Sequence, residues 1–303
     1  MSRGPFSGVL APVLTPFNAD LSVDVPRWVD FCRQLLDEGC SGLAIFGTTS
    51  EANALALEEK LELLQALRDA GVPGGKLMPG TGLCALPETV RLTRAAVAAE
   101  AGAVLLLPPF YYKAVDDDGL YRYAAEVIER VGDARLRVYL YHIPPIAQVG
   151  WPPAVVERLA RAYPDTVVGL KDSGGDMTYT HAVLGRLPDF GAFVGNERFV
   201  KEAVEAGGPG TITATANVNA RAIDRLWQRL GKTGADELND AVCAVRREVE
   251  RFPTIPGLKA VLARRTGHPG WARVRPPLTP LPEQQGDDLK AKLDALSALA
   301  PVR

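Results

Sequence analysis

The feature that most constrains the fold is a regular alternation of short apolar runs with amphipathic stretches. Runs rich in apolar and β-branched residues recur at 9–17, 42–47, 76–82, 103–109, 137–144, 167–174, 190–197 and 210–218. Each run is followed by a stretch of roughly ten to seventeen residues with helical periodicity. Alternating strand–helix units indicate a parallel sheet covered by helices, and eight such units indicate closure into an α/β fold, the (β/α)8 barrel.

The predicted helices carry the expected end signals. The segment 25–39 ends on Gly39, and the segment 86–102 has Pro87 near its start and Gly102 at its end. An open doubly wound sheet is the alternative fold, but no G-x-G-x-x-G sequence opens the first helix. The 303 residues suit a single barrel.

The part of the chain after the eighth unit reads as helices. The segment 235–252 is periodic, further helical segments follow it, and 275–286 is a proline-rich connector. We therefore expect a barrel domain over 1–231 and a C-terminal helical region over 232–303 that packs on the barrel.

Composition excludes several classes of function. The formal charge of −2 gives no sign of a nucleic-acid partner, and no apolar run is long enough for a membrane span. The N-terminal residues lack the basic-then-apolar layout of a secretory signal, and the four cysteines form no C-x-x-C pair. We expect reduced cysteines and a cytoplasmic protein. The three histidines lie far apart in sequence, so we expect no metal site.

In a barrel, the chemistry takes place at the C-terminal ends of the strands. Lys171 directly follows the apolar run VVGL (167–170) at such an end. Desolvation disfavours the charged form of a lysine, and a neutral amine attacks a ketone to form a Schiff base. The alternative is a strand-end lysine that pairs with Asp172 or extends to solvent. The local pattern leaves both interpretations open.

Two further strand ends carry candidate groups. Tyr141 lies near the end of the fifth run, where a phenol could move protons beside an imine, although most tyrosines simply pack in the core. Thr48 and Thr49 follow Gly47 in a turn whose N–H groups and hydroxyls could hold a carboxylate. The alternative for this turn is ordinary capping of the next helix.

Four motifs in matching order resemble one known family. VLTPF (13–17), GTTSE (47–51), YHIP (141–144) and GLKDSGG (169–175) resemble the dihydrodipicolinate synthase / N-acetylneuraminate lyase family of class I aldolases. The likeness covers about residues 6–300. It implies a (β/α)8 barrel with C-terminal helices, a homotetramer or homodimer, and no metal or organic cofactor.

The resemblance also implies roles for individual residues. Lys171 would form the Schiff base with pyruvate or another 2-oxo acid, and Tyr141 would carry protons. Thr48 would relay them, while Thr49 and Gly47 would bind the carboxylate.

Two roles implied by the resemblance lie elsewhere in the sequence. Tyr111 in PPFYY would complete the relay from a neighbouring subunit, an alignment that Tyr112 makes uncertain by one place. Ile212 would turn its backbone carbonyl toward the substrate.

The departures from the family concern the second substrate. Ile146 stands where synthases of lysine precursors carry an arginine for the aldehyde's carboxylate, and isoleucine cannot make those bonds. The sequence of residues 171–175 is closer to that of aldolases and dehydratases acting on 2-oxo-3-deoxy sugar acids or hydroxy-oxoglutarate, and Ser173 could bind a substrate hydroxyl. Asn196 and Glu197 stand where sialic-acid lyases bind the tail of their substrate, unless they are solvated loop residues.

The favoured function is therefore reversible aldol cleavage, or dehydration, of a 2-oxo acid, with an aldehyde as the second partner. One alternative is 4-hydroxy-tetrahydrodipicolinate synthase, which Ile146 disfavours. A second alternative is a barrel that binds an oxo acid without catalysis, which the set Lys171, Tyr141 and Thr48 disfavours. A phosphosugar barrel is a further alternative, but the glycine-rich segment 207–210 precedes the eighth run instead of following it.

Overall fold

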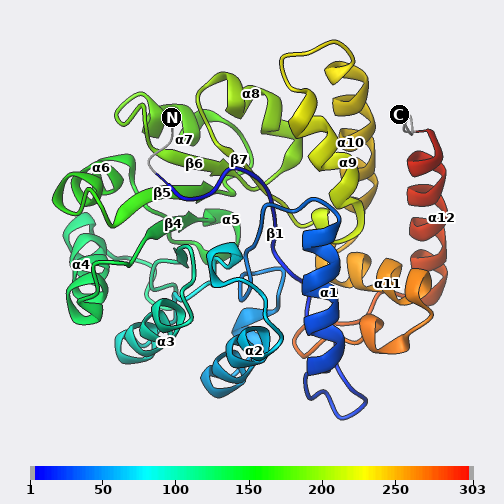
Figure 1. The fold of residues 1–303 in the computed structure, drawn as a ribbon, viewed down its shortest axis with the longest axis horizontal. Coiled ribbons are helices and arrows are strands. Elements are labelled where there is room, and N and C mark those ends of the chain that lie inside the picture. Colours follow the sequence, from blue (N-terminus) through cyan, green and yellow to red (C-terminus); the bar gives the residue numbers. More distant parts are fainter. Residues whose placement is uncertain (1–3, 300–303) are drawn as a thin grey trace. The chain divides into compact units, whose positions relative to one another are not determined.

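The computed structural model describes residues 4–299 (Figure 1). Contacts between residues divide the chain into two compact units, each made of two separate stretches. Among the described residues, the first unit contains 4–8 and 56–212, and the second contains 9–55 and 213–299. The predicted boundary between residues 231 and 232 stays a prediction.

The first unit holds a parallel sheet with the strand order β7-β6-β5-β4-β3. The strands are β3 (Val104–Leu106), β4 (Val138–His142), β5 (Val167–Asp172), β6 (Gly191–Val194) and β7 (Gly210–Ile212). Nearly every residue in them is buried, as expected for a parallel sheet that is covered on both faces.

Helices of the first unit pack side by side in chain order, α2 on α3, α3 on α4, α4 on α6 and α6 on α7 (Figure 1). They are α2 (Leu57–Asp69), α3 (Leu86–Ala98), α4 (Asp117–Val131), α5 (Pro144–Ala147), α6 (Pro153–Ala162), α7 (Thr178–Leu184) and α8 (Val200–Glu205). Short 3-10 turns, η2 (Gly74–Lys76) and η3 (Glu197–Phe199), complete the unit.

One predicted strand is much shorter than expected. The segment 76–82 forms only an isolated parallel bridge, Gly80 to Leu105. The carbonyl of Pro79 accepts from the N–H of Leu105 at 2.8 Å, and the N–H of Thr81 donates to the carbonyl of Leu105 at 3.0 Å. Proline has no N–H to give to a sheet, which limits the pairing here.

One predicted helix end is also wrong. Helix α3 ends at Ala98, and Glu100 instead of Gly102 takes the left-handed conformation, with φ of 57°. Gly102 has a different reason to be glycine. A Cβ there would lie 2.6 Å from the carbonyl oxygen of Gly75 and 2.8 Å from the ring of Phe6.

The second unit joins a short strand pair to the C-terminal helices. Strands β1 (Gly8–Ala11) and β2 (Gly42–Leu43) pair in parallel, and α1 (Val25–Asp37) packs on β2 and α9. Helix α9 packs on α10 and α11, and both of these pack on α12. The bounds are η1 (Ala52–Ala54), α9 (Ala216–Arg229), α10 (Ala235–Val249), α11 (Thr254–Thr266), η4 (Pro269–Ala272) and α12 (Glu283–Leu299).

Helix α1 follows its prediction closely. Asp24 caps it by accepting from the N–H of Arg27 at 3.2 Å, and Gly39 has φ of 100° just beyond its end. Within residues 4–299, no helix combines the length and the apolar character needed to cross a membrane.

Candidate active site

Lys171 lies in the middle of the first unit's sheet. It is the fifth residue of β5 and is only 4% exposed, although it is charged in water. In the register of the strands, Tyr141 on β4 and Phe193 on β6 are its direct neighbours. The Lys171 Nζ lies 4.4 Å from the centre of the Tyr141 ring. The sheet therefore places the amine and the phenol predicted to act together on adjacent strands.

The Tyr139 ring, together with Phe193 and Phe6, forms an aromatic layer beside Lys171, and Tyr139 precedes Tyr141 on β4 by two residues. Gly169 precedes Lys171 on β5 and pairs with Tyr139 on β4. A Cβ on Gly169 would lie 2.3 Å from the Tyr139 ring, so only glycine leaves room for that ring. The Tyr139 ring packs edge-on against Phe193 at 5.7 Å and against Phe6 at 6.5 Å. This layer keeps one side of the lysine dry.

Asp172, the next residue on β5, does not serve as the partner of Lys171. Its carboxylate accepts from the Thr180 hydroxyl at 2.7 Å and from the Gly174 N–H at 2.8 Å. Successive side chains of a strand point to opposite faces, which explains the separation. Burial raises the pKa of Asp172, an effect that these hydrogen bonds oppose. With Lys171 buried, the interpretation as a lysine extending to solvent does not fit.

His142 follows Tyr141 on β4 and packs away from it. Its ring stacks on that of Tyr179 with 3.6 Å between centres and 7° between planes. Its Nδ1 accepts from the Trp151 N–H at 3.1 Å, and the Tyr179 hydroxyl donates to the Trp151 carbonyl at 2.5 Å. Burial lowers the pKa of His142 to about 4, so the ring is neutral at pH 7. A neutral ring with an accepting Nδ1 carries its proton on Nε2.

Ser173 is held close to the end of β6. Its N–H donates to the His142 carbonyl at 2.8 Å, and the Gly195 N–H donates to the Asp172 carbonyl at 2.6 Å. A Cβ on Gly195 would lie 2.1 Å from the Ser173 Oγ. The serine hydroxyl thus occupies the space that a side chain at Gly195 would need.

The remaining predicted residues of the first unit lie at the ends of β6 and β7. Asn196 caps η3, because its Oδ1 accepts from the Arg198 N–H at 3.0 Å. Glu197 is fully buried, so the alternative interpretation of this residue as a solvated loop residue is wrong. Ile212 is the last residue of β7 and is also fully buried.

Tyr111 lies in the loop after β3, and Ile146 lies in α5. Tyr111, Tyr112 and Ile146 are 74%, 73% and 63% exposed, and the two tyrosine rings meet edge-on at 5.3 Å. The Lys113 Nζ donates to the Ala147 carbonyl at 2.9 Å and so ties this loop to α5. The first unit thus presents large apolar side chains to solvent beside the end of β4.

Gly47, Thr48 and Thr49 lie in the second unit. The expected strand 42–47 pairs only over Gly42–Leu43, and Phe46 takes a left-handed conformation with φ of 59°. A tight turn follows, in which the N–H of Ser50 donates to the Gly47 carbonyl at 3.1 Å. Thr49 is 8% exposed, and Thr48 is partly exposed.

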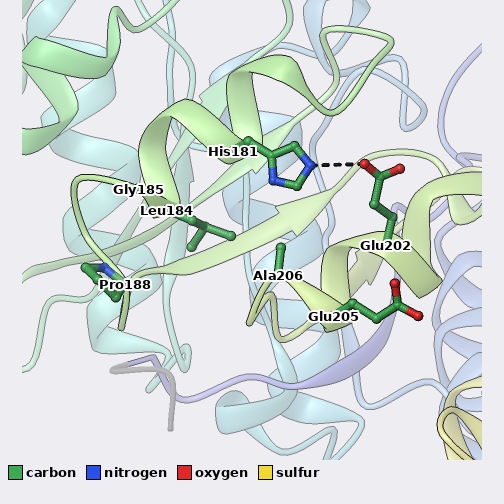
Figure 2. Close-up of a pocket in the computed structure, with 7 residues that line it drawn as sticks. All are labelled: His181, Leu184, Gly185, Pro188, Glu202, Glu205 and Ala206. Atoms are coloured by element: carbon green, nitrogen blue, oxygen red, sulfur yellow. Dashed lines mark hydrogen bonds and ion pairs between the residues drawn. The ribbon is translucent and has the colours of Figure 1, made fainter.

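A separate hollow lies between α7 and α8 of the first unit. It has a volume of about 520 Å³ and is lined by His181, Leu184, Gly185, Pro188, Glu202, Glu205 and Ala206. Figure 2 shows His181 and Glu202 facing each other across it, with Nε2 and Oε1 3.0 Å apart. None of the predicted site residues lines it. Across residues 4–299, no group of three or more His, Cys, Asp or Glu side chains is arranged to hold a metal ion.

Comparison with known proteins identifies the family. The model of the dihydrodipicolinate synthetase family matches residues 5–296. The chain belongs to this family. A lyase of Chloroflexus aurantiacus described as DapA-like is 31% identical over 96% of this chain and 97% of that protein. A 4-hydroxy-tetrahydrodipicolinate synthase of Thermus thermophilus is 36% identical over 74% of each chain.

Solved structures of the dihydrodipicolinate synthase family have the same fold. The enzyme from Agrobacterium tumefaciens matches with a TM-score of 0.88 and 28% identity, over 96% of this chain and 99% of that one. The Escherichia coli protein YagE, solved with pyruvate, matches with a TM-score of 0.85 and 26% identity over the same shares. The predicted fold class, a (β/α)8 barrel with C-terminal helices, is confirmed. The chain is an enzyme, an aldolase-type lyase of this family.

The sequence interpretation missed several groups around the site. Nothing in the local pattern marked Tyr139 as the ring beneath Lys171, because an aromatic residue in a strand is the usual core residue. Gly195 lies within the predicted run 190–197, where no local pattern marks it as the neighbour of Ser173. A recognisable signal was present for Lys259, which lies in the apolar run GLKAVL as Lys171 lies in VVGLKD.

Proposed function

We propose that this enzyme forms a Schiff base between Lys171 and pyruvate or another 2-oxo acid. The observation that carries the proposal is a lysine only 4% exposed whose Nζ lies 4.4 Å from the ring of Tyr141 on the next strand. The amine attacks the 2-oxo carbon, and the oxygen leaves as water. The resulting protonated imine withdraws electrons from the carbon atom next to it. That carbon can then take the electron pair of its bond to the following carbon and form an enamine, so this second carbon–carbon bond can be broken or made.

The other predicted residues supply the proton transfers and the binding of the acid. Tyr141 passes protons to and from the reacting oxygen, with Thr48 and the partner subunit's copy of the tyrosine in PPFYY as the relay. Thr49 and Gly47 bind the carboxylate of the 2-oxo acid through the hydroxyl and N–H groups of their turn. The carbonyl of Ile212 faces the same substrate. These assignments rest on the family resemblance, and Tyr141, Thr49 and Ile212 are in addition buried.

The second substrate is a neutral or hydroxylated aldehyde, and the acid that is cleaved is a 2-oxo sugar acid or a related compound. Ile146 is 63% exposed on α5 and offers no charge to a second carboxylate. Ser173 presents its hydroxyl at the end of β6 beside Gly195, and it binds a substrate hydroxyl together with Asn196 and Glu197. Reversible aldol cleavage or dehydration is the reaction.

The second candidate is the synthase reaction of pyruvate with aspartate semialdehyde. It is favoured by the name of the Thermus thermophilus relative, which is 36% identical over 74% of this chain. Ile146 argues against it, because a second carboxylate would lack its bidentate partner. We therefore rank the sugar-acid reaction first.

A panel of substrates separates the two candidates. Purified enzyme is given 2-oxo-3-deoxy sugar acids, hydroxy-oxoglutarate, and pyruvate with aspartate semialdehyde, and turnover is followed by mass spectrometry. The proposal expects turnover of at least one sugar acid, with aspartate semialdehyde poorer by about a hundredfold or more in kcat/KM. Efficient use of aspartate semialdehyde alone would establish the synthase reaction instead.

The assembly and the compartment also remain proposals. Tyr111, Tyr112 and Ile146 are the large apolar side chains exposed on the described residues, and we propose that they lie in an interface between copies of the chain in a homotetramer or homodimer. None of the four cysteines forms a disulfide within residues 4–299, which is consistent with the cytoplasmic location that we propose.

A further inference from the structure

A second lysine is buried even more completely than Lys171. Lys259, on α11 of the second unit, has no exposed surface, and its Nζ donates to Glu51 Oε1 at 2.5 Å. Glu51 is 4% exposed and directly follows the turn that holds Thr48 and Thr49. Burial lowers the pKa of Lys259 to about 8, an effect that the Glu51 carboxylate opposes. The C-terminal region therefore contacts the end of the GTTSE motif through a dry ion pair.

The second oxygen of the same carboxylate is held as well. Glu51 Oε2 accepts from the Arg275 N–H at 3.0 Å. The Arg275 guanidinium donates to the Ala54 carbonyl at 2.6 Å and to the Leu21 carbonyl at 2.8 Å. The Phe17 ring lies 4.3 Å from the Lys259 Nζ. Both oxygens of Glu51 are thus fixed by groups that follow the last strand by more than forty residues.

The turn itself is bounded by two unusual backbone conformations. Phe46 and Glu51 have φ of 59° and 57°, and neither residue is glycine. Left-handed conformations of such residues are unfavourable and persist only where the surroundings hold them. Within the turn, the Glu51 N–H donates to the Thr48 carbonyl at 3.1 Å, and the Thr15 hydroxyl donates to the Ser50 carbonyl at 2.8 Å.

Stability alone does not explain the ion pair. Desolvating two charges is so unfavourable that well-packed apolar residues of similar volume often serve the fold as well or better. A charged pair that fixes a strained turn next to substrate-binding residues is better explained by the geometry it imposes.

We propose that Glu51 is a positioning residue that, through Lys259 and Arg275, holds residues 47–50 in the shape with which Thr48 and Thr49 bind the carboxylate of a 2-oxo acid. The inference rests on the proposed function and deepens it. It gives the C-terminal helical region a part in substrate binding, because Lys259 and Arg275 both belong to it.

The test uses the imine as its readout. Borohydride reduces an imine to a stable amine, so the fraction of enzyme that gains mass reports occupancy by the 2-oxo acid. The pyruvate concentration that gives half of the maximal mass gain is measured for the full-length wild type and for the double variant Glu51→Leu/Lys259→Met. The double variant leaves no buried charge unpaired within the pair, so it is expected to fold.

Two further variants act as controls. Glu51→Gln/Lys259→Met keeps the side-chain oxygen that accepts from the Arg275 N–H. Leu289→Ala removes a fully buried side chain of α12 and destabilises the same helical region without touching the turn. Thermal melting of each protein shows the loss of stability against which its half-saturation is compared.

The expected result is a rise of about tenfold or more in the half-saturating pyruvate concentration of the Leu/Met variant. The half-saturating pyruvate concentration of the Gln/Met variant is expected to lie between those of the Leu/Met variant and the wild type. That of Leu289→Ala is expected to equal the wild-type value. Wild-type half-saturation in the Leu/Met variant, or a rise that follows only the melting temperature across all variants, would overturn the inference while leaving the proposed function intact. A wild type that traps neither pyruvate nor any of a panel of 2-oxo acids would overturn the proposed function, and the inference with it.

Discussion

Single residues at the ends of β4 and β5 divide into two groups by strand alternation. Tyr141 and Lys171 are neighbours in the register, and so are His142 and Asp172. The first pair meets over the aromatic layer, whereas the second pair packs among Trp151, Tyr179 and Thr180. A change of one position therefore separates residues that we expect to touch substrate from residues that hold the strands in place.

The neutral state of His142 makes the stability of the protein depend on pH. Its pKa is about 4 in the folded protein, against about 6.5 unfolded, so the unfolded chain binds more protons between these values. The stability that this group contributes is present above pH 6.5 and is lost as the pH falls toward 4. From pH 7 to pH 5 we expect the wild type to lose about 2 kcal/mol of unfolding free energy relative to His142→Asn.

Urea unfolding of both proteins at the two pH values checks this prediction. The difference between wild type and variant is the quantity of interest, because other titrating groups cancel in it. A pH-independent difference would show that His142 has the same pKa in the folded protein as in the unfolded chain.

Ile146 tests the identity of the second substrate. Because Ile146 is 63% exposed on α5, an arginine fits there without repacking the core. We expect Ile146→Arg to raise kcat/KM for aspartate semialdehyde by about tenfold or more through charge-assisted hydrogen bonds to its carboxylate. Ile146→Gln, which is polar but uncharged, is the control in the same coupled assay. Equal gains from both variants would contradict the argument from charge.

At the scale of elements, two glycines without side chains let residues of neighbouring strands, or of the segments just after them, come close together. Gly169 makes room for the Tyr139 ring below Lys171, and Gly195 makes room for Ser173. Gly169 lies on the strand next to that of Tyr139, and Gly195 and Ser173 directly follow the neighbouring strands β6 and β5. The close approach is thus a property of two strands and not of either one.

Gly195 and Ser173 are therefore expected to be coupled. We predict that Gly195→Ala destabilises the protein by about 1–3 kcal/mol, because its Cβ would lie 2.1 Å from the Ser173 Oγ. Adding Ser173→Ala removes the colliding atom and should recover much of that loss. Urea unfolding of the two single variants and the double variant measures the coupling, and strictly additive effects would contradict the predicted contact.

The sequence predicts the type of most elements correctly. Its predictions are wrong where contacts with residues distant in sequence decide the local structure. The repeating runs and the Gly39 end signal depend on local chemistry, so α1 and most strands were predictable. The strand over 76–82 was not, because Pro79 limits its pairing in a way that only the neighbouring strand reveals. Likewise, the local pattern predicts a helix end at Gly102, whereas the lack of a side chain there leaves room for the Gly75 carbonyl and the Phe6 ring.

The candidate site was predictable to the extent that its residues stand at strand ends. Lys171 could be found because a lysine after four apolar residues is chemically conspicuous. The ion pair of Glu51 and Lys259 joins residues 208 positions apart, and no local pattern specifies such a partner. The sequence thus indicates which residues can react, while the groups that orient them emerge only from the fold.

At the scale of the whole molecule, we expect self-association to complete the site. The exposed pair Tyr111 and Tyr112 leaves a polar tip on an apolar ring at each position, as is common in interfaces. We predict that Tyr112→Asp shifts the protein toward smaller species in sedimentation velocity. Tyr111→Phe is expected to keep the assembly and to lower kcat by about tenfold or more, since the proposed proton relay needs its phenol. A fully active monomer at low concentration would contradict the relay between subunits.

The most direct test of the account asks which residue carries the imine. The wild type and Lys171→Ala are each treated with pyruvate and borohydride, weighed intact, digested and mapped by tandem mass spectrometry. The account predicts one pyruvate-dependent adduct per chain, on the peptide that contains Lys171, and none in the variant. An adduct on another residue such as Lys259, or one that persists in Lys171→Ala, would contradict the central claim.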